Sequence, residues 1–170
     1  MRRIAFVLIA ALTLALTNSG CKRACKDVTC FNGGDCNSSG MCNCVNRWGG
    51  LNCEEFCPLG YEGSFCNQLS RRNVIRTWNA TTTSPNTGTV QHPLYITEGT
   101  TAEKIIINNF NNEGYTMIGY FSGKGKFDIV SQNATGSFTG IVDGAGNLNG
   151  DKLTIDLTKE GINYFASCNK

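Results

Sequence analysis

Between about residue 69 and the C-terminus, apolar and polar residues alternate one by one in many short stretches. The clearest is KLTIDLT at 152–158, where polar residues separate Leu153, Ile155 and Leu157. Successive side chains of a β-strand point to opposite faces, so this alternation predicts strands with one face in a core and the other in water. We expect strands near residues 74–82, 88–97, 102–109, 114–122, 126–132, 135–142, 152–158 and 161–168.

Turn-forming residues separate these stretches. They are Pro85-Asn86, Asn111-Asn112, Gly123-Lys124-Gly125 and the run DGAGN at 143–147. Seven to eight short antiparallel strands are typical of a small sandwich or barrel. The sequence therefore predicts an all-β domain at residues 74–170, an antiparallel sandwich or flattened barrel, preceded by a linker at 67–73.

The other strongly apolar stretch lies near the N-terminus, from Ile4 to Leu16. It follows Arg2-Arg3 and precedes the polar segment TNSG, an order typical of a secretory signal. Its 13 residues are fewer than the roughly 20 that a membrane-spanning helix needs. We therefore expect residues 1–20 to be a signal peptide that is removed on export.

Cysteines are concentrated in one part of the chain. Nine of the ten lie between Cys21 and Cys66, and the tenth is Cys168. So many cysteines indicate an oxidising compartment. A segment of about 40 residues with few aliphatic side chains cannot bury a sufficient core, and disulfides typically stabilise such segments by roughly 2–4 kcal/mol each. Spacing alone does not choose among the pairings that eight cysteines permit.

The spacing C-x4-C-x5-C-x5-C-x-C-x8-C from Cys25 to Cys53 resembles an EGF-like (epidermal growth factor-like) domain. The resemblance includes an Asn32-Gly33-Gly34 turn and a closing loop with Trp48 and Gly50. The last loop, up to Cys66, looks like the fourth loop of the laminin-type variant. For residues 25–66 the resemblance implies the bridges Cys25 to Cys36, Cys30 to Cys42 and Cys44 to Cys53, with Cys57 and Cys66 as the remaining pair.

The segment Ser19-Gly20-Cys21 is similar to a bacterial lipoprotein cleavage site, in which a lipid is attached to the cysteine. Residues 21–24 would then be a tether with Cys21 as the lipid anchor. The alternative is a disulfide between Cys21 and Cys168, which is otherwise free or available for an intermolecular bond. An anchor cysteine, one EGF-like module and a short β domain resemble a group of lipoproteins of Gram-negative bacteria, which implies a location on the outer membrane. Free secretion is the alternative.

Charge and composition exclude several function classes. Removal of the signal leaves 13 basic residues (15 minus 2) and 13 acidic ones, without any long basic run, so nucleic-acid binding is not expected. The only histidine, His92, is interpreted as a surface residue in a loop. No nucleophile or phosphate-loop motif is present, so we predict neither an enzyme nor a cofactor. Zinc and calcium are not expected either, because the cysteine spacing and the loop at 37–41 do not fit their sites.

Three aromatic residues of the cysteine-rich segment, Trp48, Tyr61 and Phe65, are candidate binding residues for a protein or glycan. Alternatively they cover the disulfides. The leading hypothesis is a non-enzymatic, membrane-anchored envelope lipoprotein, in which an EGF-like spacer or adhesion module presents a β domain to a partner. The alternatives are a secreted EGF-like factor that binds a receptor and a small β-barrel carrier of an apolar ligand.

Overall fold

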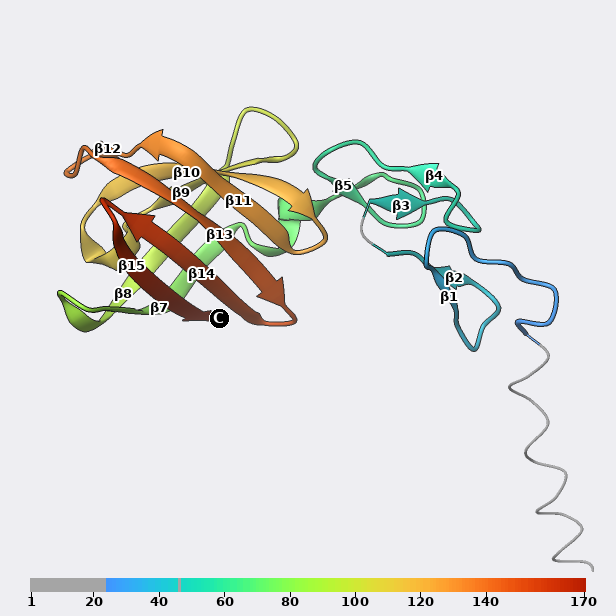
Figure 1. Cartoon of the computed structure of the whole chain (residues 1–170). Coiled ribbons are helices and arrows are strands. Elements are labelled where there is room, and N and C mark those ends of the chain that lie inside the picture. Colours follow the sequence, from blue (N-terminus) through green and yellow to red (C-terminus); the bar gives the residue numbers. More distant parts are fainter. Residues whose placement is uncertain (1–23, 46) are drawn as a thin grey trace, which may run out of the picture.

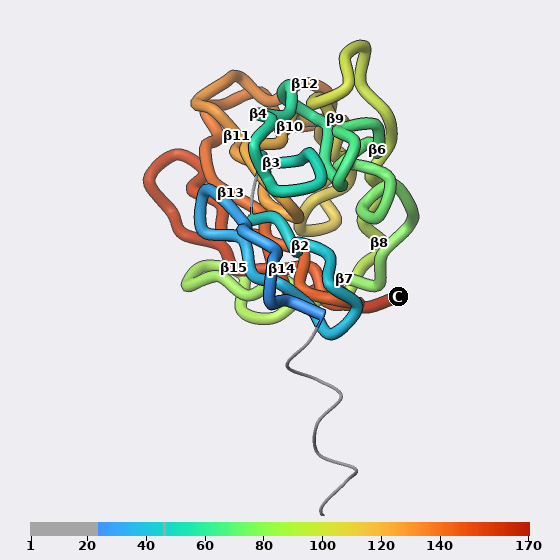
Figure 2. The backbone as a smooth tube through the Cα atoms, turned by 90° about the vertical axis from the view of Figure 1, so that its right-hand side faces the viewer, coloured from blue at the N-terminus to red at the C-terminus, as the bar shows by residue number. Residues whose placement is uncertain are grey.

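The computed structural model describes residues 24–45 and 47–170, which form two regions placed end to end (Figure 1). A disulfide module occupies residues 24–69, and a β-barrel follows it. Figure 2, viewed from the side of the module, shows the module in front of one end of the barrel. In the described part of the chain, no helix has the length and apolar character needed to cross a membrane.

Eight antiparallel strands form the barrel. Each strand pairs with the next one along the chain, and β15 pairs with β7 to close the ring. Because the ring is closed, no strand of it has a free edge. The all-β prediction is confirmed, and of its two forms the structure is a barrel. The strands are β7 (Arg76–Ser84), β8 (Gly88–Glu98), β9 (Lys104–Asn108), β10 (Tyr115–Gly123), β11 (Lys126–Asn133), β13 (Ile141–Asn149), β14 (Lys152–Lys159) and β15 (Ile162–Asn169), with the short β12 (Thr135–Gly136) paired to β10.

Alternate residues of each strand fill the barrel interior. The largest fully buried side chains include Trp78, Tyr115 and Phe127, accompanied by leucines and isoleucines of several strands. Trp78 Nε1 donates a hydrogen bond to the carbonyl of Val74 at 2.9 Å, which satisfies its one polar atom. An eight-stranded barrel is about wide enough to be filled by such side chains. The interior is therefore a packed core.

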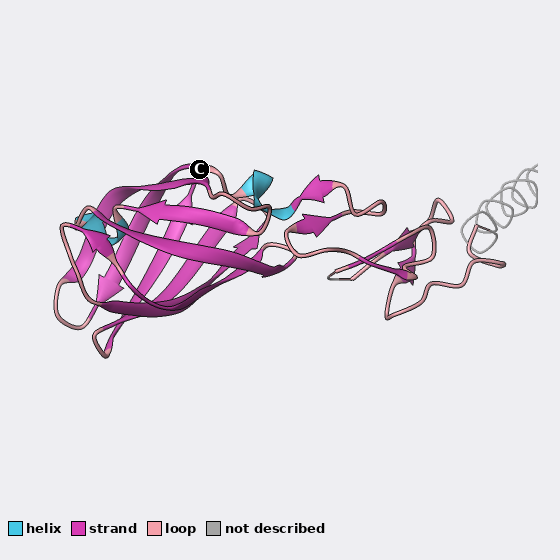
Figure 3. Ribbon diagram, turned by 90° about the horizontal axis from the view of Figure 1, so that it is seen from above, coloured by secondary structure: helices cyan, strands magenta, loops and turns pink. Residues whose placement is uncertain are grey.

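Two 3-10 helices lie near opposite ends of the barrel (Figure 3, cyan). Helix η1 (Ser70–Asn73) follows the module, within the segment expected to be a linker, whereas η2 (Phe110–Asn112) connects β9 to β10. Phe110 of η2 is fully buried, and its ring meets the Tyr164 ring edge-on at a centroid distance of 6.3 Å. η2 therefore closes the end of the barrel that lies away from the module.

The turn predicted at 143–147 and the strand predicted at 135–142 are wrong, because residues 141–149 form the strand β13. The glycines of this segment serve close packing. A side-chain carbon at Gly146 would lie 2.0 Å from Phe127 Cζ, and one at Gly144 would lie 2.1 Å from the backbone oxygen of Asp156. Neither glycine has the positive φ that a tight turn uses.

The interpretation of His92 as a surface loop residue is also wrong. His92 lies in β8 with its side chain inside the barrel, where Nε2 is 2.9 Å from Thr82 Oγ1. Burial lowers the pKa of its imidazole, although the backbone of Pro93 and Asn109 acts in the opposite direction. Strand alternation through Leu94 and Ile96 carries the residue inward, so His92 belongs to the core.

The disulfide module consists of three short hairpins joined by turns. They are β1 (Asp35–Cys36) with β2 (Cys42–Asn43), β3 (Trp48–Gly49) with β4 (Glu55–Phe56), and β5 (Tyr61–Glu62) with β6 (Gln68–Leu69). Four disulfides hold them: Cys25–Cys36, Cys30–Cys42, Cys44–Cys53 and Cys57–Cys66. These are the same four pairs that the sequence resemblance implies.

Cys168 is the one free cysteine of the described residues, and it is fully buried in the barrel core. Burial raises the pKa of its thiol to about 12, so the thiol stays protonated and unreactive at neutral pH. An intermolecular bond through Cys168 would require the barrel to open. Cys21 is expected to be the lipid anchor or, alternatively, the disulfide partner of Cys168. It lies outside the described residues, together with the signal segment.

Candidate binding site

The orientation of the module on the barrel depends on one buried arginine of η1. Arg71 Nη1 donates hydrogen bonds to the carbonyl oxygens of Gly99, Thr101 and Lys104, at 3.1, 2.5 and 3.2 Å. Gly99 and Thr101 belong to the loop between β8 and β9, and Lys104 is the first residue of β9. Several hydrogen bonds from one charged donor hold the segment firmly, because each exceeds a neutral bond in strength.

The module also touches this loop directly. Gly60 has a φ of +83°, and a side-chain carbon there would lie 2.4 Å from the backbone nitrogen of Glu103. Only glycine permits this conformation and this approach without strain. The close contact and the Arg71 anchor together fix the two regions as one unit, so that a cavity between them has a defined shape.

A cavity of about 530 Å³ lies at the junction of the module and the barrel. Its walls come from β2, β3, β5 and β6 of the module, from η1, and from the hairpin between β10 and β11. This volume falls within the range of small-ligand sites, roughly 300–1,000 Å³. The lining side chains that could contact a ligand through a charge, a hydrogen bond or an aromatic ring are Asn43, Arg47, Trp48, Glu62, Ser64, Gln68, Arg72 and Lys124.

Positive charge predominates in this junction cavity. Arg47, Arg72 and Lys124 face a single carboxylate, Glu62, whose Oε1 lies 3.6 Å from Arg72 Nη2. Burial raises the pKa of the Glu62 carboxyl above its ordinary value, while Arg72 and Lys124 act to lower it. Glu62 Oε2 and Arg47 Nε are buried without a hydrogen-bond partner among the described residues. The cavity therefore has both an excess of cations and unused polar atoms.

The position of Trp48 in the cavity wall is set by its neighbours. Its ring meets Phe56 edge-on at a centroid distance of 5.2 Å, and the Arg47 guanidinium lies 4.2 Å from the centre of the same Phe56 ring. Both contacts are favourable arrangements for aromatic and cationic groups. Phe56 thus orients an indole and a guanidinium toward one cavity.

The three aromatic residues predicted as binding candidates do not gather in one place. Trp48 lines the junction cavity, whereas Tyr61 and Phe65 do not. Tyr61 is half-buried in β5 opposite Leu69, and the Phe65 side chain is 70% exposed at the surface.

The charged residues of the cavity have no signal in the sequence. Arg47, Arg72 and Lys124 are far apart along the chain, and the sequence has no long basic run. Only the fold brings them together, so a search for basic clusters in the sequence misses them.

The cavity lining offers cations, amides, a hydroxyl and an indole. Its lining has one carboxylate and no histidine, so it lacks the usual pairs of acid and base. Across residues 24–45 and 47–170, no three His, Cys, Asp or Glu side chains are grouped so that they could hold a metal ion. The available chemistry is cation–anion contact, hydrogen bonding and aromatic stacking.

Comparisons with known proteins add little to this description. No protein-family model and no curated protein sequence matches the chain. A solved structure described as a redesigned β-barrel is similar over 59% of this chain and 94% of its own length, with 13% identity and a TM-score of 0.47. A likeness at this level supports no conclusion about function, and the fold assignment depends on the strand pairing above.

Proposed function

We propose that this protein is an exported, non-enzymatic binding protein that holds an anionic saccharide in the junction cavity. The observation that carries the proposal is the convergence of Arg47, Arg72, Lys124 and Trp48 on one cavity. Guanidinium groups bind carboxylate, sulfate or phosphate through paired hydrogen bonds. An indole provides a flat apolar surface for a sugar ring.

The polar residues between the cations favour a saccharide over a simple anion. Asn43, Ser64 and Gln68 provide amide and hydroxyl groups that match the hydroxyls of a sugar. Acidic peptides are the competing class of ligand. Such a peptide would bind the cationic side chains of the cavity and would not need a contact with the Trp48 indole. The core of the barrel is filled with side chains, so we place the ligand outside the barrel rather than within it.

The export and attachment of the protein form the second part of the proposal. Four disulfides in the module favour an oxidising location, and their pairing favours an EGF-like module of the laminin type. We infer a lipid on Cys21, which would hold the module and its cavity at a membrane surface. Labelled-palmitate incorporation into the wild type but not into a Cys21→Ala variant is the expected result. A wild-type chain that takes up no label would leave the protein freely secreted.

Substitution of Lys124 tests the cavity. Isothermal titration of the whole mature protein with a sulfated uronic-acid tetrasaccharide should show binding, and Lys124→Ala should weaken it by about tenfold, the loss of one charge-assisted hydrogen bond. Lys126→Ala is the matched control, because Lys126 is also an exposed lysine of the same hairpin but does not line the cavity. That variant should bind like the wild type.

Two further titrations separate the ligand classes. Trp48→Ala should weaken saccharide binding as well, and a neutral tetrasaccharide should bind poorly. Tighter binding of a glutamate-rich peptide, unaffected by Trp48→Ala, would assign the cavity to acidic peptides instead. If neither probe binds, or if Lys126→Ala has the same effect as Lys124→Ala, the junction cavity is not the binding site.

A further inference from the structure

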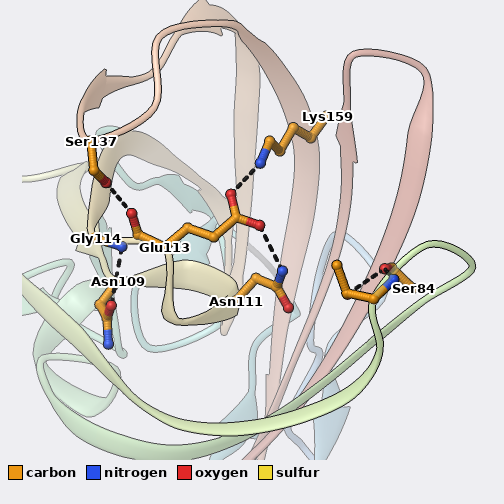
Figure 4. Close-up of polar contacts among 8 residues, drawn as sticks. Ser84, Asn109, Asn111, Glu113, Gly114, Ser137 and Lys159 are labelled. Atoms are coloured by element: carbon orange, nitrogen blue, oxygen red, sulfur yellow. Dashed lines mark hydrogen bonds and ion pairs between the residues drawn. The ribbon is translucent and has the colours of Figure 1, made fainter.

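A second polar cluster lies at the end of the barrel away from the module, and a single carboxylate is at its centre (Figure 4). Lys159 is the last residue of β14, and its ammonium contacts Glu113 Oε2. The amide nitrogen of Asn111 donates a hydrogen bond to the other oxygen, Glu113 Oε1, at 2.7 Å. The Glu113 carboxylate therefore binds an amine on one side and a carboxamide on the other.

Aromatic rings enclose the amine. Lys159 Nζ lies 3.9 Å from the centre of the Phe138 ring, 5.4 Å from that of Tyr115 and 5.9 Å from that of Tyr164. The Lys159 side chain is only 13% exposed, and Asn111 is 5% exposed. Water therefore has little access to the amine and the amide themselves, whereas the Glu113 side chain between them is 28% exposed.

The backbone around Asn111 is held in an uncommon conformation. Asn109, Asn111 and Asn112 all have a positive φ, at 64°, 54° and 59°. Residues other than glycine adopt a positive φ only uncommonly. Such conformations persist where the surrounding structure imposes them, often at functional sites. The neighbouring Phe110 is fully buried and anchors this segment in the core, and the Asn111 amide is held against Glu113.

Two buried polar atoms of the cluster lack a partner among the described residues. They are Asn111 Oδ1 and the hydroxyl oxygen of Tyr115. Burial raises the pKa of Tyr115, with the Glu113 charge as a second cause, so the hydroxyl remains a hydrogen-bond donor at neutral pH. An amide carbonyl and a protonated phenol without partners are groups that a reaction at the amide would use.

We propose that Lys159 and Asn111 become joined by an isopeptide bond, an amide between Lys159 Nζ and Asn111 Cγ, with Glu113 as the proton carrier. The Glu113 carboxylate takes one proton from the ammonium. The neutral amine swings from Oε2 onto Cγ of Asn111 and forms the new C–N bond. The protonated Glu113 gives its proton to Nδ2, which departs as ammonia. The carboxylate then accepts the second proton of the amine and passes it to the ammonia, which leaves as ammonium.

The atoms and charges of this step balance without any co-reactant. A lysine ammonium and an asparagine carboxamide give one secondary amide and one ammonium ion, and the carboxylate is regenerated. The arrangement brings the amine and the amide to the two oxygens of one acid–base group and shields both from bulk water, and these conditions favour acyl transfer to an amine. The product would tie the end of β14 to the segment that closes this end of the barrel.

Intact-mass measurement of the reduced and denatured mature protein tests the proposal directly. The wild type should be lighter by one ammonia molecule than the mass expected for its sequence together with any lipid on Cys21. Digestion should yield one branched peptide that contains both residue 111 and residue 159. Lys159→Met and Glu113→Gln should restore the full mass, whereas Asn111→Asp should lose water instead of ammonia. Lys152→Met is the matched control, because Lys152 lies at the other end of β14, and this variant should still lose ammonia.

The wild-type measurement decides the question even if a variant does not fold. A wild-type chain of full mass, with residues 111 and 159 in separate unmodified peptides, would overturn the proposal. Loss of ammonia confined to one linear peptide would overturn it as well. Such a loss would come from a cyclic imide at an asparagine that precedes glycine, and Asn32 and Asn149 are in that position.

Discussion

Gly146→Val should destabilise the barrel by about 3 kcal/mol or more, at the upper end of what overpacking a core costs. An added side-chain carbon at residue 146 would lie 2.0 Å from Phe127 Cζ, and the ring of Phe127 is fully buried. The ring cannot move away, because Phe121 packs against it at a centroid distance of 5.7 Å and Gly119 lies under it. Denaturant unfolding, followed by the fluorescence of the buried Trp78, measures the loss.

The neighbouring Ala145 provides the matched control. Its side chain points to the outside of the same strand, so Ala145→Val should change the stability by less than about 0.5 kcal/mol. Combining Gly146→Val with Phe127→Leu should recover part of the loss, because the leucine makes room for the valine. Equal effects at residues 145 and 146, or strictly additive effects in the double variant, would mean that the contact with Phe127 is not the cause.

The regular alternation of the barrel strands could be predicted from the sequence, but the role of the glycines could not. The strand expected at 152–158 is found at Lys152–Lys159, because its apolar residues alternate without interruption. In β13 the inward positions are occupied partly by Gly144 and Gly146, which leave no apolar signal. Glycine is common in turns, and it also occurs in strands whose backbone lies against a large ring or a neighbouring strand. The glycines of β13 therefore could not be told from turn glycines in the sequence.

The candidate sites were beyond sequence reasoning for a different reason. The junction cavity takes Arg47 from the module, Arg72 from η1 and Lys124 from a barrel hairpin. The cluster around Glu113 joins a connecting segment to the end of β14, 46 residues along the chain. Neither set has a characteristic spacing, because its members meet only after the barrel closes. The disulfide pairs, in contrast, could be predicted because the cysteine spacing resembles that of an EGF-like domain, and the resemblance implies these pairs.

The two regions depend on different sources of stability. In the barrel, a continuous cluster of apolar side chains forms the core, and none of the four disulfides lies there. In the module, Cys42, Cys53 and Cys57 are the buried hydrophobic residues. Two of its glycines pack directly against the bridges: an added carbon at Gly34 would lie 2.7 Å from Cys53 Sγ, and one at Gly49 the same distance from Cys66 Sγ.

Reduction of the protein should consequently unfold the module and leave the barrel folded. Each bridge closes a loop whose ends are 9 to 12 residues apart, and loss of a bridge in a small domain typically costs roughly 2–5 kcal/mol. Hydrogen exchange after treatment with a phosphine reductant should become fast throughout residues 25–66 and remain slow in β7 to β15.

Saccharide binding should disappear at the same step, because the module supplies most of the cavity wall. Cys168→Ser tests whether the barrel thiol contributes to this response. The sulfur of Cys168 is buried and unpaired among the described residues. In this variant the amides of the module should therefore lose their protection from hydrogen exchange at the same reductant concentration as in the wild type. Slow exchange of the module after full reduction would mean that its fold survives without the sulfur cross-links, and simultaneous exchange of the barrel would mean that the two regions unfold as one.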